Sequence, residues 1–210
     1  MTGPALLRAG DRGWMVDLEP ERVAPVVRSA RVQDWSYLVQ DIIPASRSIL
    51  FCANDSADMD RLATRIRYLL DSAGTEPGVV SDRDPVIVPV RYDGADLPGV
   101  ARSLDRTVDE VVAAHVDAEH RVGFFGFAPG FAYIDGLPES LKLPRRSSPR
   151  PRVDRGLVAI AGTQTVVYPG GTPGGWHLIG STSEILWDPK SDQPSRLSVG
   201  DRVIFRPVTR

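Results

Sequence analysis

The chain has few of the residues that build disulfides and metal centres. Among its 210 residues are one cysteine, Cys52, and three histidines. A single cysteine excludes an intrachain disulfide and fits a reducing compartment, so we expect a cytoplasmic protein. His115 and His120 are five residues apart, which is the wrong interval for one helix face. The sequence therefore predicts no metal site and no prosthetic group.

The chain also lacks a strong net charge, a long apolar run and the common nucleotide motifs. Its formal net charge of −2 gives no basic field for nucleic acid. No apolar run is long enough to cross a bilayer, and residues 1–10 lack the apolar region of a signal peptide. We find no Gly-x-Gly-x-x-Gly turn between a strand and a helix, no Walker A lysine and no nucleophile elbow. These absences argue against a standard phosphate loop and against a serine-hydrolase triad.

What is present is typical of a globular protein of two small domains or one large one, with 42% hydrophobic and 25% charged residues. Residues 1–80 predict a small α/β domain whose helices pack on one face of a sheet. The expected strands are 13–18, 38–43 and 48–53, and the expected helices are 19–31 and 59–70. Residues 71–85 are polar and rich in turn residues, which places the domain junction there unless they form a long loop within one domain.

The second domain is expected over residues 85–210. It opens with a strand over 86–92, and Thr107 and Glu110 form a capping box that begins a helix. From residue 121 onward the pattern is short strands and turns, which favours a barrel or a sandwich. The expected strands are 157–161, 164–168, 176–179, 184–187 and 201–207.

The segment from Gly123 to Thr182 combines many Gly and Pro residues with interleaved aromatic side chains. A disordered linker would lack the apolar residues, so these glycines and prolines are expected to shape the backbone around a pocket. The pocket-shaping residues that we predict are Phe127, Pro129, Gly130, Phe131, Gly174, Gly175 and Trp176.

Residues 142–155 carry a local charge of +5, from six basic side chains and one acid. This segment is either a solvated loop or a site for a carboxylate or phosphate, which arginine binds with two parallel hydrogen bonds. Residues 162–164 are either a plain hairpin turn or a ligand contact, in which Gly162 admits a close approach and Gln164 offers a donor and an acceptor. His115 lies on the apolar stripe of its helix. It is either a core histidine or a proton carrier that points into the pocket the barrel makes.

Three long segments give the sequence a family resemblance. They are GFAPGFAYIDGLPESLKLPRRSSPRPRV, AIAGTQTVVYPGGTPGGWHLIGST and PSRLSVGDRVIFRPV, and VRYDGADLPGVA and DEVVAAH precede them. Together they resemble the KipI / allophanate hydrolase subunit 1 family over residues 86–208, and DIIPASRSILF extends the likeness loosely to the first 80 residues. The resemblance implies an α+β protein, with a small N-terminal α/β domain and a C-terminal cyclophilin-like β-barrel. Residues 153–157 depart from the family's usual pattern, so the resemblance does not support ligand contacts at residues 154–157.

The family includes the B subunit of a 5-oxoprolinase. With the A subunit, with a C subunit that is homologous to allophanate hydrolase subunit 2, and with ATP as co-substrate, it converts 5-oxo-L-proline to L-glutamate. One subunit is expected to be inactive alone. On this basis His115 is the expected proton carrier, and Arg145 and Arg150 are the expected carboxylate or phosphate clamps. The remaining expected substrate contacts are Gly162, Gln164 and Tyr168.

Two other functions are compatible with the same resemblance. A KipI-type regulator would inhibit a sensor histidine kinase, and its surface would matter more than its pocket. A carboxyltransferase component of the allophanate hydrolase or urea carboxylase type would act within a larger enzyme. Prolyl isomerase activity is not expected, because a fold does not carry function and the motifs of true cyclophilins are absent.

Overall fold

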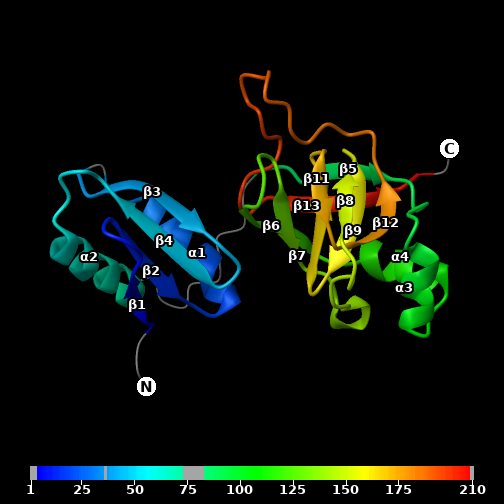
Figure 1. The fold of residues 1–210 in the computed structure, drawn as a ribbon, viewed down its shortest axis with the longest axis horizontal. Helices are drawn as coiled ribbons and strands as arrows, with labels where there is room; N and C mark the ends of the chain where they lie inside the picture. The colour runs from blue at the N-terminus through cyan, green and yellow to red at the C-terminus, as the bar shows by residue number, and fades with distance from the viewer. Residues whose placement is uncertain (1–3, 36, 73–82, 209–210) are drawn as a thin grey trace. The chain divides into compact units, whose positions relative to one another are not determined.

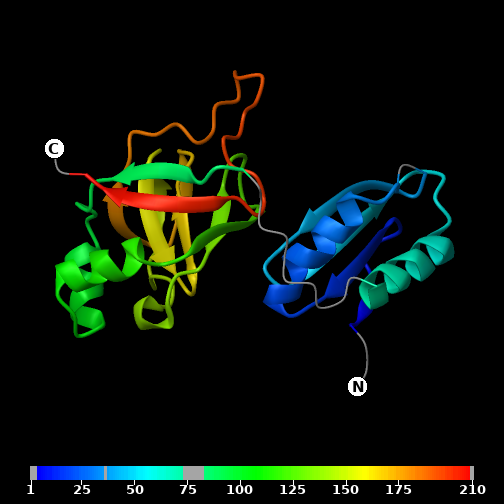
Figure 2. The same cartoon turned by 180° about the vertical axis from the view of Figure 1, so that it is seen from behind.

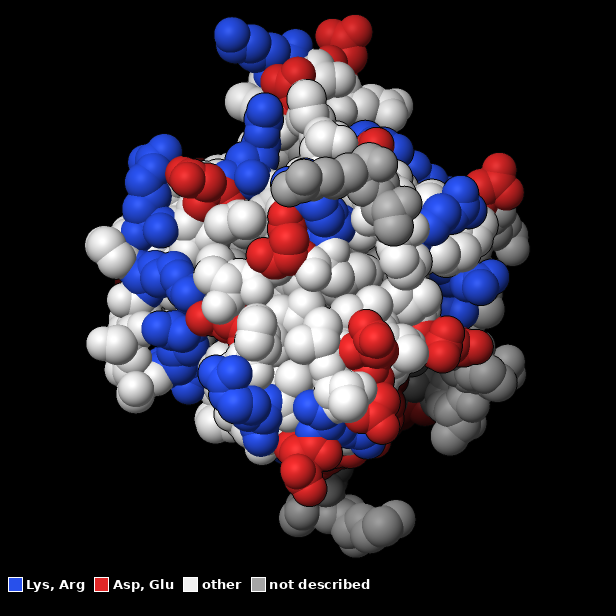
Figure 3. Space-filling model, turned by 90° about the vertical axis from the view of Figure 1, so that its right-hand side faces the viewer, with Lys and Arg blue, Asp and Glu red and all other residues white. Residues whose placement is uncertain are grey.

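The computed structural model describes residues 4–35, 37–72 and 83–208, and the chain divides into two units, Met1–Val80 and Ser81–Arg210. Most of the predicted junction over residues 71–85 lies outside the described residues. Within the described part of the chain, no helix combines the length and the apolar character needed to cross a bilayer. The face shown in Figure 3 mixes basic and acidic side chains with uncharged residues, in keeping with the small net charge.

The first unit is a four-stranded antiparallel sheet with both helices on one face, as Figures 1 and 2 show. Its sheet order is β1-β2-β4-β3. Helices α1 and α2 each carry a stripe of apolar residues at helical spacing. These side chains are buried in a core that also includes residues of β4. The predicted helices and three strands are confirmed, and the additional strand is β1. The elements are β1 (Leu6–Arg8), β2 (Gly13–Asp17), α1 (Pro20–Arg31), β3 (Val39–Pro44), β4 (Ser48–Ala53) and α2 (Met59–Ser72).

The second unit is a seven-stranded sheet with a separate two-stranded ribbon, β8–β11. In Figure 1, α3 and α4 lie at one end of this sheet. The elements are β5 (Val86–Val90), α3 (Leu97–Ser103), α4 (Val108–Val116), β6 (His120–Phe125), β7 (Ala132–Asp135), the 3-10 helix η1 (Glu139–Leu141), β8 (Arg150–Val153), β9 (Leu157–Ala161), β10 (Gln164–Val167), β11 (Thr172–Gly174), β12 (His177–Ser181) and β13 (Arg202–Pro207).

The seven-stranded sheet closes almost completely on itself. Its order is β12-β9-β10-β7-β6-β13-β5, so β12 and β5 are the outer strands. Just after β5, the Arg91 amide donates to the Ser181 carbonyl and the Ser181 amide donates to the Arg91 carbonyl, both at 2.8 Å. These bonds join the two edges, and closure leaves few unpaired strand groups. The predicted α+β class with a β-barrel is confirmed.

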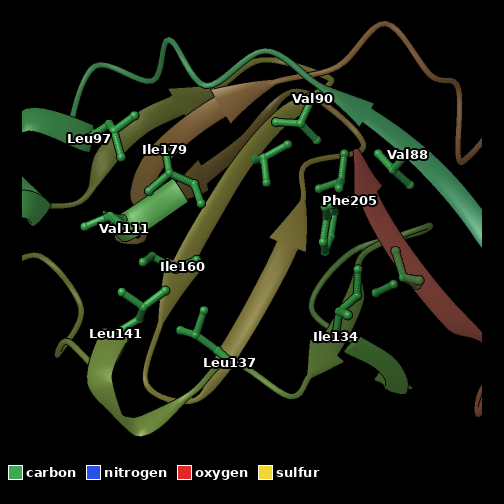
Figure 4. Close-up of a cluster of buried hydrophobic side chains, with 14 of the residues drawn as sticks. Val88, Val90, Leu97, Val111, Ile134, Leu137, Leu141, Ile160, Ile179 and Phe205 are labelled. Atoms are coloured by element: carbon green, nitrogen blue, oxygen red, sulfur yellow. The ribbon is translucent and has the colours of Figure 1, made fainter. Parts of the chain in front are cut away.

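The barrel wall has a different apolar cluster on each side, because successive side chains of a strand point to opposite faces. Val158 and Ile160 of β9 belong to the inner cluster, which Figure 4 shows filled by aliphatic side chains and Phe205. Ala159 and Ala161 of the same strand belong to an outer cluster. The interior of the barrel is therefore a packed core, and any pocket on this wall has to lie outside it.

One helix was missed, one predicted strand was wrong and one local prediction was confirmed in detail. Helix α3, which has Pro98 and Gly99 in its first turn, was not predicted. Residues 184–187 are not a strand; there the structure has a single bridge from Trp187 to Ser195. The capping box is present, with the Glu110 amide donating to the Thr107 hydroxyl at 3.2 Å and the Thr107 amide donating to the Glu110 carboxylate at 2.7 Å.

Candidate functional site

A cavity of about 200 Å³ lies on the outer face of the barrel wall. The wall contributes Tyr133 of β7, together with Tyr168 and Phe131, which lie just beyond strand ends. The ribbon contributes Pro173 and Gly174 of β11, and Pro149 lies directly before β8. A drug-sized ligand usually occupies 300 Å³ or more, so this cavity suits a smaller molecule of about metabolite size.

Most of the cavity lining was predicted from the sequence. Arg145 and Tyr168 line it, as do the pocket-shaping residues Phe127, Phe131, Gly174, Gly175 and Trp176. Tyr133, Pro149 and Pro173 also line it and were not predicted. The alternation of inward and outward side chains along β7 could have identified Tyr133. Ala132 and Ile134 face the inner core, so Tyr133 between them faces outward.

Aromatic rings pack against one another around the cavity, mostly edge to face. Phe131 is central, with ring centroids 5.1 Å from Tyr133 and 5.3 Å from both Tyr168 and Phe127. The Tyr133 ring lies 5.9 Å from that of Trp176. Such contacts between rings at 4.5–7 Å stabilise their mutual positions. The walls of the cavity are therefore fixed by packing between the rings.

Arg145 is held at the cavity by its neighbours in the chain. The Arg146 amide donates to the Gly175 carbonyl at 2.7 Å, and His177 Nε2 lies 2.9 Å from the Pro144 carbonyl oxygen. The Arg145 guanidinium carbon lies 5.7 Å from the Trp176 ring centroid, within the range of a cation–π contact. Both residues that flank Arg145 are thus bound to the segment that carries Trp176.

Asp96 anchors the rest of the basic segment, and sequence reasoning missed it. Its Oδ1 accepts from Arg146 Nη1 and Arg150 Nη2, both at 2.8 Å, and its Oδ2 accepts from the Leu178 amide at 2.7 Å. Burial by itself raises the pKa of Asp96, but the hydrogen bonds from Arg150 and Leu178 and the two guanidinium charges hold that pKa below 3.8. The only sequence signal for Asp96 was its place inside one of the family-like segments.

Arg150 is therefore not placed as a ligand clamp. Its side chain is 25% exposed, binds Asp96 and does not line the cavity. Part of the segment predicted as a loop is strand β8, which begins at this residue and pairs with β11. Of the two predicted clamps, Arg145 lines the cavity. Arg150 instead forms an ion pair with Asp96, which anchors the segment that carries Arg145.

Gly162 and Gln164 also lie away from the cavity. Gly162 is at the tip of the β9–β10 hairpin with φ +58°, and its amide donates to the Leu143 carbonyl at 2.7 Å. Gln164 Nε2 donates to Asp135 Oδ1 at 2.7 Å. The two residues belong to a plain hairpin turn, which was the alternative to a ligand contact. Neither of them lines the cavity.

Pro129 and Gly130 border a second hollow of about 530 Å³, which also includes Trp187, Ser195 and Leu197. Gly130 has φ +74°, and a Cβ there would lie 2.2 Å from the Trp187 ring, so this position requires glycine. Phe127 borders both hollows, is 63% exposed and has φ +68°, which a bulky residue rarely adopts. Backbone strain of this kind is concentrated at functional sites.

His115 lies on the opposite side of the barrel wall from the cavity. Its side chain has no exposed surface, and the Tyr92 hydroxyl lies 2.8 Å from Nδ1 while the Thr165 hydroxyl lies 3.0 Å from Nε2. Thr165 faces inward on β10, whereas Val166 belongs to the outer cluster. The structure gives His115 no contact with the cavity, because the barrel interior is filled and the cavity is outside it. Its position is that of a core histidine.

His115 and His120 are neighbours despite the unsuitable helical spacing. Helix α4 ends at Val116 and β6 begins at His120, and His120 Nε2 lies 2.7 Å from the His115 carbonyl oxygen. The two ring centroids lie 4.7 Å apart, and Phe205 packs against both rings. Burial, and then the neighbouring His120, hold the pKa of His115 well below 6.5, and burial also lowers the pKa of His120. Among the described residues, no group of three or more His, Cys, Asp or Glu side chains could hold a metal ion.

We expect the stability of the second unit to fall as the pH is lowered from 7 to 5. Well above pH 6.5 both histidines are neutral in the folded and unfolded states. Below it the unfolded chain binds protons that the folded core excludes, so the free energy of unfolding falls by up to about 1.4 kcal/mol per pH unit for each histidine that stays neutral. Urea unfolding at several pH values measures this. A free energy that stays constant or rises over this range would contradict it.

The Tyr168 side chain leaves no room for a Cβ at residue 174, so replacing Gly174 tests the cavity directly. A Cβ on Gly174 would lie 2.2 Å from the Tyr168 hydroxyl oxygen, whereas on Gly175 the nearest atom is 3.6 Å away. Tyr168 is buried and packed against Phe131, so Gly174→Ala has to displace it and reshape the cavity. We expect Gly174→Ala to reduce cavity-dependent activity at least about tenfold, since misplaced binding groups have effects of this size.

Gly175→Ala is the matched control for this substitution. It adds the same methyl group one residue away, and we expect less than a twofold loss. The activity that depends on the cavity, with thermal unfolding to confirm the fold, is measured for both variants. Equal losses in the two variants would refute a specific requirement for glycine at residue 174.

The sequence also matches a known protein family. The model of the carboxyltransferase domain, subdomain C and D, matches residues 4–197. The chain belongs to this family. It is similar to the B subunit of 5-oxoprolinase from Escherichia coli O157:H7, with 37% identity over 94% of this chain and 93% of that protein. It is also similar to the subunit of the same name from Bacillus subtilis, with 44% identity over 59% of this chain and 53% of that protein.

A solved structure supports the fold of this carboxyltransferase-family chain. The crystal structure of the Kluyveromyces lactis urea carboxylase matches 98% of this chain with a TM-score of 0.72 and 18% identity. This chain corresponds to 22% of that enzyme. At this identity the match shows a common fold and carries no conclusion about the reaction.

Proposed function

We propose that this chain is the B-type subunit of a 5-oxoprolinase. With subunits of the A and C types, it would convert 5-oxo-L-proline to L-glutamate with ATP as co-substrate. The observation that carries the proposal is the 37% identity that extends over nearly the whole of this chain and of the B subunit from E. coli. A cavity of metabolite size in this chain is compatible with that role.

The chemistry of lactam opening suggests how the subunits divide the work. A lactam carbonyl resists water until its oxygen is polarised, and phosphorylation of that oxygen by ATP would activate it. We assign the phosphoryl transfer to the partner subunits, because this sequence has no standard phosphate loop. The part of this chain is then to bind and orient the substrate with preorganised donors in a site with apolar walls.

The proposal gives His115 no direct part in the reaction. The imidazole is buried behind the barrel wall, and both ring nitrogens already have hydroxyl partners. A general acid or base has to come within hydrogen-bond reach of the proton that it transfers. We therefore propose a structural role for His115 and place substrate contact in the outer cavity.

Reconstitution tests the proposed function. The chain is co-purified with the A-type and C-type subunits of the same genome, and glutamate release from 5-oxo-L-proline is measured with and without ATP. We expect ATP-dependent release from the three proteins together and none when this chain is omitted. The same rate without this chain would refute the proposal, and so would the absence of glutamate from an assembled complex of all three.

A further inference from the structure

Every polar side chain that lines the outer cavity can donate a hydrogen bond. Arg145 and the Trp176 indole can only donate, and the hydroxyls of Tyr133 and Tyr168 can donate or accept. No carboxylate is among the described residues that line it. A site with this wall favours a ligand that brings its own acceptors, and the guanidinium charge selects an anion.

Arg145 is the cation that remains available to such a ligand. Arg146 and Arg150 are bound to Asp96, whereas no described carboxylate forms an ion pair with Arg145. Its backbone is tied down on both sides, through the Arg146 amide and the Pro144 carbonyl. Binding would therefore order little more than one side chain, which keeps its entropic cost low. One guanidinium matches one negative charge, so the site suits a carboxylate better than a doubly charged phosphate.

The remaining walls restrict the shape of the ligand. Phe131, Tyr133 and Trp176 present ring edges and faces that are fixed by mutual packing. Exposed Phe127 stands at the border of the cavity, where its ring contacts that of Phe131. A volume of about 200 Å³ between aromatic walls suits a compact ring better than a long or branched chain.

We propose that this cavity binds a compact cyclic monocarboxylate, with Arg145 gripping the carboxylate and the aromatic rings enclosing the ring of the ligand. That the ligand is a carboxylate is inferred from the residues that line the cavity, independently of the proposed function. The choice of 5-oxo-L-proline as its ligand rests on the proposed function. In the assembled enzyme this arrangement would fix the substrate by its carboxylate and leave the lactam carbonyl for the reaction.

Calorimetric titration of the purified full-length chain tests this inference. The probes are 5-oxo-L-proline and 2-pyrrolidinone, the same lactam ring without its carboxylate. We expect saturable binding of the first and none of the second. Arg145→Gln is expected to weaken binding at least about tenfold, the effect of a lost charge-assisted hydrogen bond. Phe127→Ala is expected to weaken it less, because it removes only one part of the wall.

Arg152→Gln is the matched control for Arg145→Gln. It removes the same charge from the same segment, but Arg152 is 71% exposed, faces Asp154 and does not line the cavity. We expect its affinity to stay within about twofold of the unsubstituted protein. Equal binding of both probes, or equal weakening by both arginine variants, would overturn the inference. So would the failure of 5-oxo-L-proline and of two further cyclic monocarboxylates, L-proline and 2-furoate, to bind.

The outcomes separate this inference from the proposed function. A reconstituted complex that releases glutamate, together with a chain that binds none of these carboxylates, would leave the proposed function standing and refute the cavity site. If the chain binds a carboxylate through Arg145 but the assembled complex releases no glutamate, the cavity site stands and the proposed function is refuted.

Discussion

Replacing His115 with Ala is expected to lower the free energy of unfolding of the second unit by about 3 kcal/mol or more. The substitution removes a fully buried ring that packs against His120 and Phe205 and leaves a cavity in the core. It also leaves the buried hydroxyl of Thr165 and the largely buried hydroxyl of Tyr92 without their partner. Urea unfolding measures the change, and hydrogen exchange of peptides within residues 86–207 assigns it to the second unit.

His177→Ala is the control for the loss of a histidine. His177 is partly exposed and its side chain is hydrogen-bonded to the Pro144 carbonyl, so we expect a change of about 1 kcal/mol or less. A His115→Ala variant as stable as the unsubstituted protein would contradict the structural role. If that stable variant also lost turnover in the reconstituted complex, the role of proton carrier would be restored.

Asp96→Ala is expected to have the second large effect, a loss of about 2 to 4 kcal/mol in the free energy of unfolding. The Asp96 side chain is 10% exposed and is the common partner of Arg146, Arg150 and the Leu178 amide. Its removal leaves two partly buried guanidinium groups without a counter-charge, in a segment that already has unpaired donors at Arg146 Nε and Arg150 Nη1. Removing one member of a buried ion pair costs far more than removing an exposed pair.

The measurement for Asp96→Ala combines unfolding with hydrogen exchange of residues 144–153. We expect faster exchange there, because the Asp96 carboxylate holds this segment beside the cavity. Asp93→Ala is the matched control. Asp93 pairs with Arg91 and Ser181 at the surface, and its loss is expected to change the stability by about 1 kcal/mol or less. Equal effects of the two substitutions would show that the Asp96 contacts contribute no more than a surface pair.

Much of the cavity could be predicted because its residues are conspicuous in the sequence. Phe131, Trp176 and the adjacent glycines occur in a segment where aromatic residues alternate with Gly and Pro, and such a segment has to form a packed surface with special backbone shapes. Arg145 was conspicuous as part of a basic run. Tyr133 was missed because it occupies an ordinary strand position, and Asp96 because a single aspartate before a short helix carries no motif.

The sequence alone determined many of the local elements, the capping box of α4 and much of the composition of the cavity wall, since these depend mainly on residue types and on residues that are near one another in the chain. Only the tertiary structure decided which residues meet. It placed Thr165 inward with His115 and Tyr168 outward at the cavity, and it brought Asp96 to Arg146 and Arg150 across fifty or more residues. The physical reason is that neighbouring strand residues face opposite sides of the barrel wall, and strand pairing sets what lies beyond each side.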